Sequence, residues 1–160
     1  MFHFFMPLVP LTLAGALFFK RKSLAYGLPI LLVLTRALLT QPSLIEFFTV
    51  SSLLITVFAV RAMKVNHPSI LKITGIAFLA ILVYEIFSNF GVWALGGCLP
   101  EQASLYAYSF SGLWECYQAA LPYMAVHFVR DIPLSLGAVK LFELVAARIR
   151  PAVHEARQSA

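Results

Sequence analysis

Long apolar segments separated by short polar stretches constrain this chain more than any other feature. A helix needs about 20 apolar residues to cross the hydrocarbon core of a bilayer. Of the 160 residues, 61% are hydrophobic and only 12% are charged, far from the composition of a soluble domain. The sequence therefore predicts an all-α, polytopic transmembrane helix bundle. The expected spans are about Phe2–Phe19, Leu24–Leu39, Leu44–Val60, Ile70–Ala94 and Gly112–Val145.

The positions of the basic residues predict how these segments cross the membrane. They gather in three places, at Lys20–Lys22, Arg61–Lys72 and Arg148–Arg157, whereas residues 96–110 contain neither Lys nor Arg. Lys and Arg concentrate in cytoplasmic loops. We therefore expect five spans in an inner cell membrane, with the N-terminus outside and the C-terminus cytoplasmic. Splitting the last segment at Pro122 or Pro133 would give six spans and place the basic tail outside, so this alternative ranks second.

The same charges bear on domain organisation and on partners. We expect one transmembrane domain, residues 1–147, followed by a short basic cytoplasmic tail, residues 148–160. The net charge of +5 lies between apolar segments rather than among exposed aromatic residues, which favours the lipid bilayer as a partner and excludes nucleic acid. Because Lys20–Lys22 follows the first apolar segment and no basic residue precedes it, that segment reads as a retained helix rather than a signal peptide.

Three side chains in the fourth segment point to a candidate site. Glu85, Asn89 and Trp93 recur every four residues, so on a helix they share one face, drifting about 40° per step. A carboxyl group deep in a bilayer is costly and by default faces the interior of a bundle. We therefore predict that this face of the fourth helix is turned away from lipid and carries function.

The last segment carries ionisable residues at a matching depth. His127 lies about as far from the outer end of its helix as Glu85 does, and Arg130 and Asp131 lie one turn deeper. We predict a buried polar cluster that Asn89 joins, below an aromatic rim. The cluster and rim together comprise Glu85, Asn89, His127, Arg130, Asp131, Trp93, Tyr117 and Tyr123. The alternative is that these groups only pair with one another and fix the fourth helix against the last.

Two further pairings are suggested by position. Arg36 and Glu46 enter the membrane at similar depth from consecutive segments and could pair. Cys98 and Cys116 both fall on the outer side, where a disulfide is possible. Free thiols are favoured because Cys116 lies among apolar neighbours, as small packing cysteines do.

The motifs of common catalytic sites are absent. The four histidines, His3, His67, His127 and His154, are scattered without HExxH or other metal spacing, and there is no Walker A, GxGxxG or GxSxG sequence. We therefore expect no metal, no cofactor and no enzymatic activity. An intramembrane acid and base pair of Glu85 and His127 is chemically possible, but no nucleophile completes it.

One motif run resembles a known group of proteins. It consists of Asn89–Trp93 (NFGVW), Tyr106–Leu113 (YAYSFSGL), Cys116–Tyr123 (CYQAALPY) and Asp131. The run is similar to the N-F-x-V-W, Y-P-x-T-x-x-G-L-x-x-C-Y-x-A-x-P-F and G-D pattern of an uncharacterised bacterial membrane family. That family resembles the S component, the substrate-capture subunit, of energy-coupling-factor vitamin transporters. Members usually carry one more N-terminal helix, and where they have Ser-Asp this chain has Thr35 and Arg36.

The resemblance implies an S-component-like bundle, an unknown small-molecule ligand and a possible membrane partner protein. We therefore expect an outward-facing pocket between the fourth helix and the last one. Glu85, Asn89 and Arg130 would orient the polar part of the ligand, while aromatic side chains supply apolar area. The alternative is a structural or scaffold membrane protein without a ligand, similar in size to the rod-shape-determining scaffold of bacterial cell walls.

Overall fold

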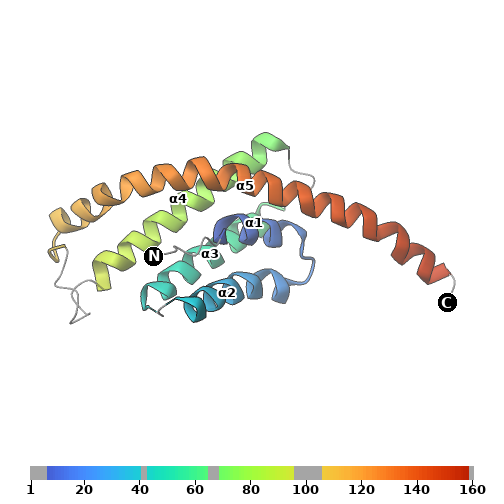
Figure 1. The fold of residues 1–160 in the computed structure, drawn as a ribbon, viewed down its shortest axis with the longest axis horizontal. Helices are drawn as coiled ribbons and strands as arrows, with labels where there is room; N and C mark the ends of the chain where they lie inside the picture. Colours follow the sequence, from blue (N-terminus) through green and yellow to red (C-terminus); the bar gives the residue numbers. More distant parts are fainter. Residues whose placement is uncertain (1–6, 41–42, 65–68, 96–105, 159–160) are drawn as a thin grey trace.

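The structure of the chain, a computed structural model, is all-α within the residues that it describes, 7–40, 43–64, 69–95 and 106–158. These ranges form five helices, whose arrangement is shown in Figure 1. They are α1 (Leu8–Phe18), α2 (Lys22–Leu39), α3 (Ile45–Ala62), α4 (Ile70–Leu95) and α5 (Phe110–Gln158). The predicted α-helical class is therefore confirmed.

Three of these helices, α2, α3 and α4, are long and apolar enough to cross a membrane, and each begins and ends within two residues of a predicted span. By contrast, α1 has 11 residues, or about 16 Å of helix, which is about half the thickness of a hydrocarbon core. The first five residues of its predicted span, 2–6, lie outside the described ranges. The described helices thus support a membrane protein with three candidate spans, and the five-span count stays a prediction.

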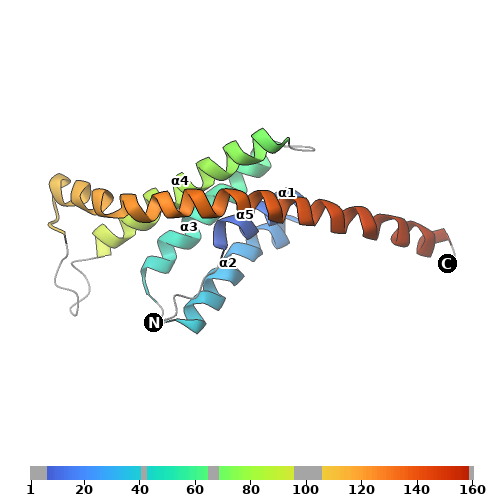
Figure 2. The same cartoon turned by 45° about the horizontal axis from the view of Figure 1, so that its top comes forward.

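The last apolar segment forms one continuous helix of 49 residues, α5, which passes through both Pro122 and Pro133. At 1.5 Å per residue it is about 73 Å long. The split of this segment that a sixth span requires is therefore not found. Figures 1 and 2 show that the C-terminal part of α5 extends well beyond the other four helices, and residues 148–158 of the predicted tail continue the helix.

The shortest helix, α1, forms the centre of the bundle and contacts each of the other four helices. Most of its residues are buried, as is typical of a helix that is apolar on all sides. Leu13 and Ala14 are completely buried and pack with Val57 of α3, Ile73 of α4 and Val139 of α5. The core that places α4 against α5 is therefore built around α1.

The outer surface of the bundle is apolar, whereas several buried positions are polar. Leu38, Leu71 and Val129 are 86%, 82% and 79% exposed. Large apolar side chains such as these are exposed along α2, α3, α4 and α5. Buried side chains include Thr49, Ser52, Glu85, Asp131 and Ser135. A soluble monomer does not expose so much apolar surface, so this arrangement suits a bundle surrounded by lipid.

Arg36 and Glu46 form the ion pair that their depth in the sequence predicts. Arg36 Nη2 lies 2.5 Å from Glu46 Oε2. Arg36 belongs to the last turn of α2 and Glu46 to the first turn of α3, so each charge also complements the dipole of its own helix. Tyr84 of α4 interacts with Arg36 as well. The pair thus connects three helices.

Replacing Glu46 with alanine is expected to lower the free energy of unfolding by about 1.5 kcal/mol, the lower end for a hydrogen bond to a charged group. The matched control is Glu143→Ala, which removes the more exposed Lys140–Glu143 pair of α5 and should cost less than about 0.5 kcal/mol. Unfolding in detergent micelles by a denaturing surfactant measures both. Equal losses for the two variants would show that the Arg36–Glu46 contact does not stabilise the bundle.

Candidate functional site

The candidate site lies where α4 packs against the N-terminal half of α5 (Figures 1 and 2). Gly112, Cys116 and Ala120 are buried on α5 at a spacing of four residues. Small residues at this spacing allow two helices in a membrane to approach closely. The thiol of Cys116 donates to the backbone carbonyl of Asn89, with 3.5 Å between the two atoms. This close packing brings the polar face of α4 against α5.

Glu85 is the centre of the polar contacts and is only 3% exposed. Its Oε1 atom pairs with Nδ1 of His127, from α5. Its Oε2 atom accepts a hydrogen bond of 3.2 Å from Nδ2 of Asn89, which also donates to the Glu85 carbonyl at 2.8 Å. Both carboxyl oxygens are therefore hydrogen-bonded, as a buried carboxylate requires.

These contacts also fix the orientation of the Asn89 amide. A carboxylate only accepts hydrogen bonds, so the NH₂ group of Asn89 must face Glu85 and its carbonyl oxygen Oδ1 must face away. Among the described residues no donor reaches that oxygen. Asn89 thus presents an unused acceptor on the α4 side of the site.

Arg130 and Asp131 form a second pair one turn deeper in α5. Arg130 Nε and Nη2 donate to the two carboxyl oxygens of Asp131, at 2.6 and 3.1 Å. Asp131 is 4% exposed, and its backbone carbonyl accepts from the hydroxyl of Ser135 at 2.7 Å. Arg130 also interacts electrostatically with Tyr84 and Glu85. The predicted cluster is thus two hydrogen-bonded groups, Glu85 with His127 and Asn89, and Arg130 with Asp131, joined by electrostatic attraction.

Of the three residues in the predicted aromatic rim, Trp93 and Tyr117 connect segments of the chain through hydrogen bonds and do not line the pocket. Trp93 Nε1 donates to the carbonyl of Ala107 at 3.0 Å, and the hydroxyl of Tyr117 donates to the carbonyl of Ile86 at 2.8 Å. Both side chains therefore tie α4 to α5 or to the segment before it. Tyr123 is 71% exposed, and its hydroxyl forms no hydrogen bond with any residue that the structure describes.

An open pocket of about 350 Å³ lies beside this network. Its lining comprises Glu85, Asn89, Val92, Tyr106, Cys116, Ala119, Ala120 and Tyr123. Three predicted site residues, Glu85, Asn89 and Tyr123, thus line the pocket. The other five, His127, Arg130, Asp131, Trp93 and Tyr117, lie outside its lining. His127 acts on the pocket through Glu85, which it holds in place.

Sequence reasoning missed several residues of the site. Tyr106 and Ala119 line the pocket without carrying a charge, and Cys116 was considered only as a packing residue or a disulfide partner. The spacing of four between Gly112, Cys116 and Ala120 was the available signal for the face of α5 that meets α4. Cys116 is a buried free thiol, and Cys98 lies outside the described residues.

Tyr84 is another residue that the sequence analysis did not single out. It interacts both with Arg36 of the Arg36–Glu46 pair and with His127 of the Glu85–His127 pair. Its ring contacts His127, with 6.2 Å between the ring centroids, and it also interacts with Arg36. Polar side chains of α2, α3, α4 and α5 are therefore connected through it. Its position next to Glu85 in the sequence was the available signal, but a tyrosine beside a carboxyl group is common.

The site offers hydrogen-bonding groups rather than a metal centre. Within the described ranges, no group of three or more His, Cys, Asp and Glu side chains could hold a metal ion. The Glu85–His127 pair can share a proton, but both oxygens of Glu85 already have partners. The arrangement is therefore suited to holding a small molecule against fixed polar groups.

Comparison with known proteins gives the chain a family but no relative of known activity. No curated protein and no solved structure is detectably similar to it. A family of unknown function, DUF6580, matches residues 1–153, nearly the whole sequence. The chain therefore belongs to the DUF6580 family of proteins of unknown function.

Proposed function

We propose that this protein binds a small solute in the pocket between α4 and α5. The observation that carries the proposal is that the buried carboxyl group of Glu85 and the half-buried amide of Asn89 line an open pocket of about 350 Å³. Pockets for small molecules span about 300–1,000 Å³ and combine apolar lining with a few fixed polar groups. Val92, Ala119 and Ala120 supply apolar area here.

The polar groups of the pocket indicate the chemistry of the ligand. Asn89 Oδ1 accepts no hydrogen bond from the described part of the chain, and the carboxyl group of Glu85 lies next to the Asn89 amide. The aromatic rings of Tyr106 and Tyr123 add apolar area, and their hydroxyls add hydrogen-bonding capacity. We expect a small solute with one apolar face and one hydrogen-bond donor that donates to Asn89. The donor would be the O–H of a hydroxyl group or the N–H of an amide or amine.

The expected orientation places this pocket on the outer side of the membrane. α4 ends at Leu95 and α5 begins at Phe110, and the segment that joins them has no Lys or Arg, unlike the basic residues at the opposite end. An outward-facing pocket suits a substrate-capture subunit, the role implied by the resemblance to S components. In that role a membrane partner protein would supply the coupling to transport.

Solute binding can be tested with a pocket-filling variant. The full chain in nanodiscs is screened by thermal unfolding against amines, polyols, amides and nucleosides. A solute present at 100 times its Kd should stabilise the folded protein by about 2.7 kcal/mol. Ala119→Phe fills the pocket from its exposed α5 wall, and it should abolish this gain. Ala125→Phe adds the same ring to an exposed position of α5 outside the lining, and it should leave the gain unchanged.

The same screen decides between solute binding and a purely structural role. If no solute stabilises the wild type while Asn89→Ala and Glu85→Gln remain folded, the polar network serves packing alone and the scaffold alternative holds. If a solute stabilises the two phenylalanine variants equally, it binds elsewhere and the pocket assignment is wrong.

A further inference from the structure

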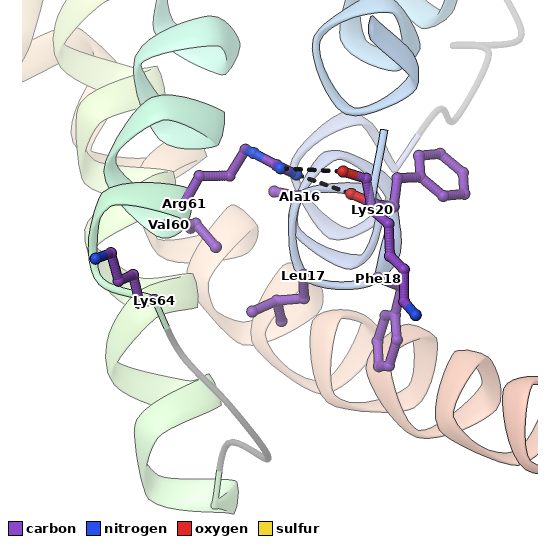
Figure 3. Close-up of a pocket in the computed structure, with 8 residues that line it drawn as sticks. Ala16, Leu17, Phe18, Lys20, Val60, Arg61 and Lys64 are labelled. Atoms are coloured by element: carbon purple, nitrogen blue, oxygen red, sulfur yellow. Dashed lines mark hydrogen bonds between the residues drawn. The ribbon is translucent and has the colours of Figure 1, made fainter. Parts of the chain in front are cut away.

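A second pocket, of about 190 Å³, lies at the opposite end of the bundle, between the ends of α1 and α3 (Figure 3). Its lining joins basic side chains to apolar ones. It comprises Ala16, Leu17, Phe18, Phe19, Lys20, Val60, Arg61 and Lys64. Three of these residues are cationic and none is acidic, so the pocket carries a net positive charge. The proposed binding of a solute in the other pocket gives no reason for this charge.

Arg61 fixes the shape of this basic pocket. Its guanidinium reaches from α3 to the end of α1, where Nη1 donates to the carbonyl of Phe19 at 2.8 Å and Nη2 to that of Lys20 at 3.4 Å (Figure 3). The last carbonyl groups of a helix have no partner within the helix, and a cation there also complements its dipole. Arg61 therefore joins α1 to α3 and holds the carbonyl groups beside the pocket in place.

Lys20 and Lys64 stand on either side of Arg61 (Figure 3). Neither ammonium group forms an ion pair with any described residue. Lys64 follows the end of α3 with a φ of 46°, the left-handed conformation that glycine or asparagine usually takes after a helix. A lysine there costs free energy that a glycine would avoid, so the site keeps a cation at a local cost.

The apolar part of the lining indicates what kind of anion would bind. Leu17, Phe18 and Val60 line the pocket together with the cations, so a ligand there meets both positive charge and apolar side chains. A phospholipid presents a phosphate next to hydrocarbon chains, and basic pockets between transmembrane helices on the cytoplasmic side bind such headgroups. The predicted orientation places this end of the bundle in the cytoplasmic leaflet.

We propose that the pocket at the ends of α1 and α3 binds the phosphate group of an anionic phospholipid. The side chains of Lys20 and Lys64 are exposed and point away from each other in Figure 3, so both turn toward the phosphate when the lipid binds. Arg61 adds positive charge and keeps the pocket in shape, and Leu17 and Val60 contact the first part of an acyl chain. This site is separate from the solute pocket and does not depend on it.

The test compares two lysine pairs at the same end of the bundle. Binding of phosphatidylglycerol to the full chain in micelles of a neutral detergent is measured by native mass spectrometry, with phosphatidylcholine and inorganic phosphate as separate arms. Lys20→Ala with Lys64→Ala should weaken phosphatidylglycerol binding by about 30-fold. Lys22→Ala with Lys72→Ala removes the same charge from exposed positions outside the pocket, and it should weaken binding by less than about threefold. The double variant Lys20→Arg with Lys64→Arg should retain binding. This result would also show that a chain substituted at both positions still folds.

Three outcomes would overturn the proposal. Equal losses in the two alanine pairs would mean that the lipid responds only to surface charge. Equal retention of phosphatidylcholine and phosphatidylglycerol by the wild type would mean that the pocket does not select an anion. Binding of inorganic phosphate as tight as that of phosphatidylglycerol, lost only with Lys20 and Lys64, would make the free anion rather than a lipid the occupant.

Discussion

Replacing Glu85 with leucine is expected to lower the free energy of unfolding by about 3 kcal/mol, the largest effect of any single substitution considered for this bundle. The substitution leaves Nδ1 of His127 and the amide of Asn89 without their shared partner between α4 and α5. Breaking a buried pair typically costs about 3–5 kcal/mol. We expect the lower end because polar groups of a chain unfolded within a membrane also find partners. Unfolding in micelles by a denaturing surfactant measures the change.

Two comparisons separate the lost contact from the loss of a carboxyl group. Glu115→Leu removes an exposed carboxyl group from the N-terminal half of α5 and should change stability by less than about 0.5 kcal/mol. His127→Leu combined with Glu85→Leu should be less destabilising than Glu85→Leu alone, because apolar replacement of both partners leaves one fewer unpaired group. If Glu85→Leu and Glu115→Leu have equal effects, the polar contacts do not hold α4 against α5.

The helices could be predicted from the sequence where the hydrophobicity and length of a segment are enough to define its ends. α2, α3 and α4 begin and end close to the predicted residues because their apolar segments are bounded by basic or turn-forming residues. α1 could not be placed in this way. Its central position depends on contacts with four other helices, and a short apolar segment gives no sign of that. The continuity of α5 through two prolines was also undecided, since proline can either kink or end a helix.

The pairing of ionisable side chains within the site could be predicted where it follows from the free-energy cost of burying an unpaired charge alone. A carboxyl group and an imidazole at equal depth had to be paired, and Glu85 and His127 are. The choice of partner for Arg130 was not predictable, because a neighbour in sequence, Asp131, can accept hydrogen bonds from two of its nitrogen atoms. The lining of the pocket could not be predicted either. Tyr106 and Ala119 line it because of where the backbone places them, and neither carries a charge that would have pointed to the site.

Replacing Gly112 with alanine is expected to destabilise the fold and to distort the solute pocket at the same time. A Cβ atom at this position would lie 2.1 Å from the carbonyl oxygen and 2.8 Å from the nitrogen of Ala107. Both are backbone atoms, so the clash cannot be relieved by a side-chain rotation. Overpacking of this kind costs about 1–3 kcal/mol. The segment before α5 must therefore move away from the helix.

That movement has consequences for the site because of what Ala107 holds. Its carbonyl oxygen accepts from the backbone N–H of Ser109 at 2.8 Å and from the indole of Trp93 at 3.0 Å, and its neighbour Tyr106 lines the pocket. Gly112→Ala should therefore shift the fluorescence of Trp93, measured with Trp114 replaced by phenylalanine, and weaken solute-induced stabilisation. Gly137→Ala is the control, since the added methyl group would meet nothing within 4 Å apart from its chain neighbours and the nearby backbone of its own helix, and it should raise stability by up to about 1 kcal/mol. Identical stability and fluorescence in the two glycine variants would show that the segment before α5 does not pack against Gly112, and that Tyr106 is not a fixed wall of the pocket.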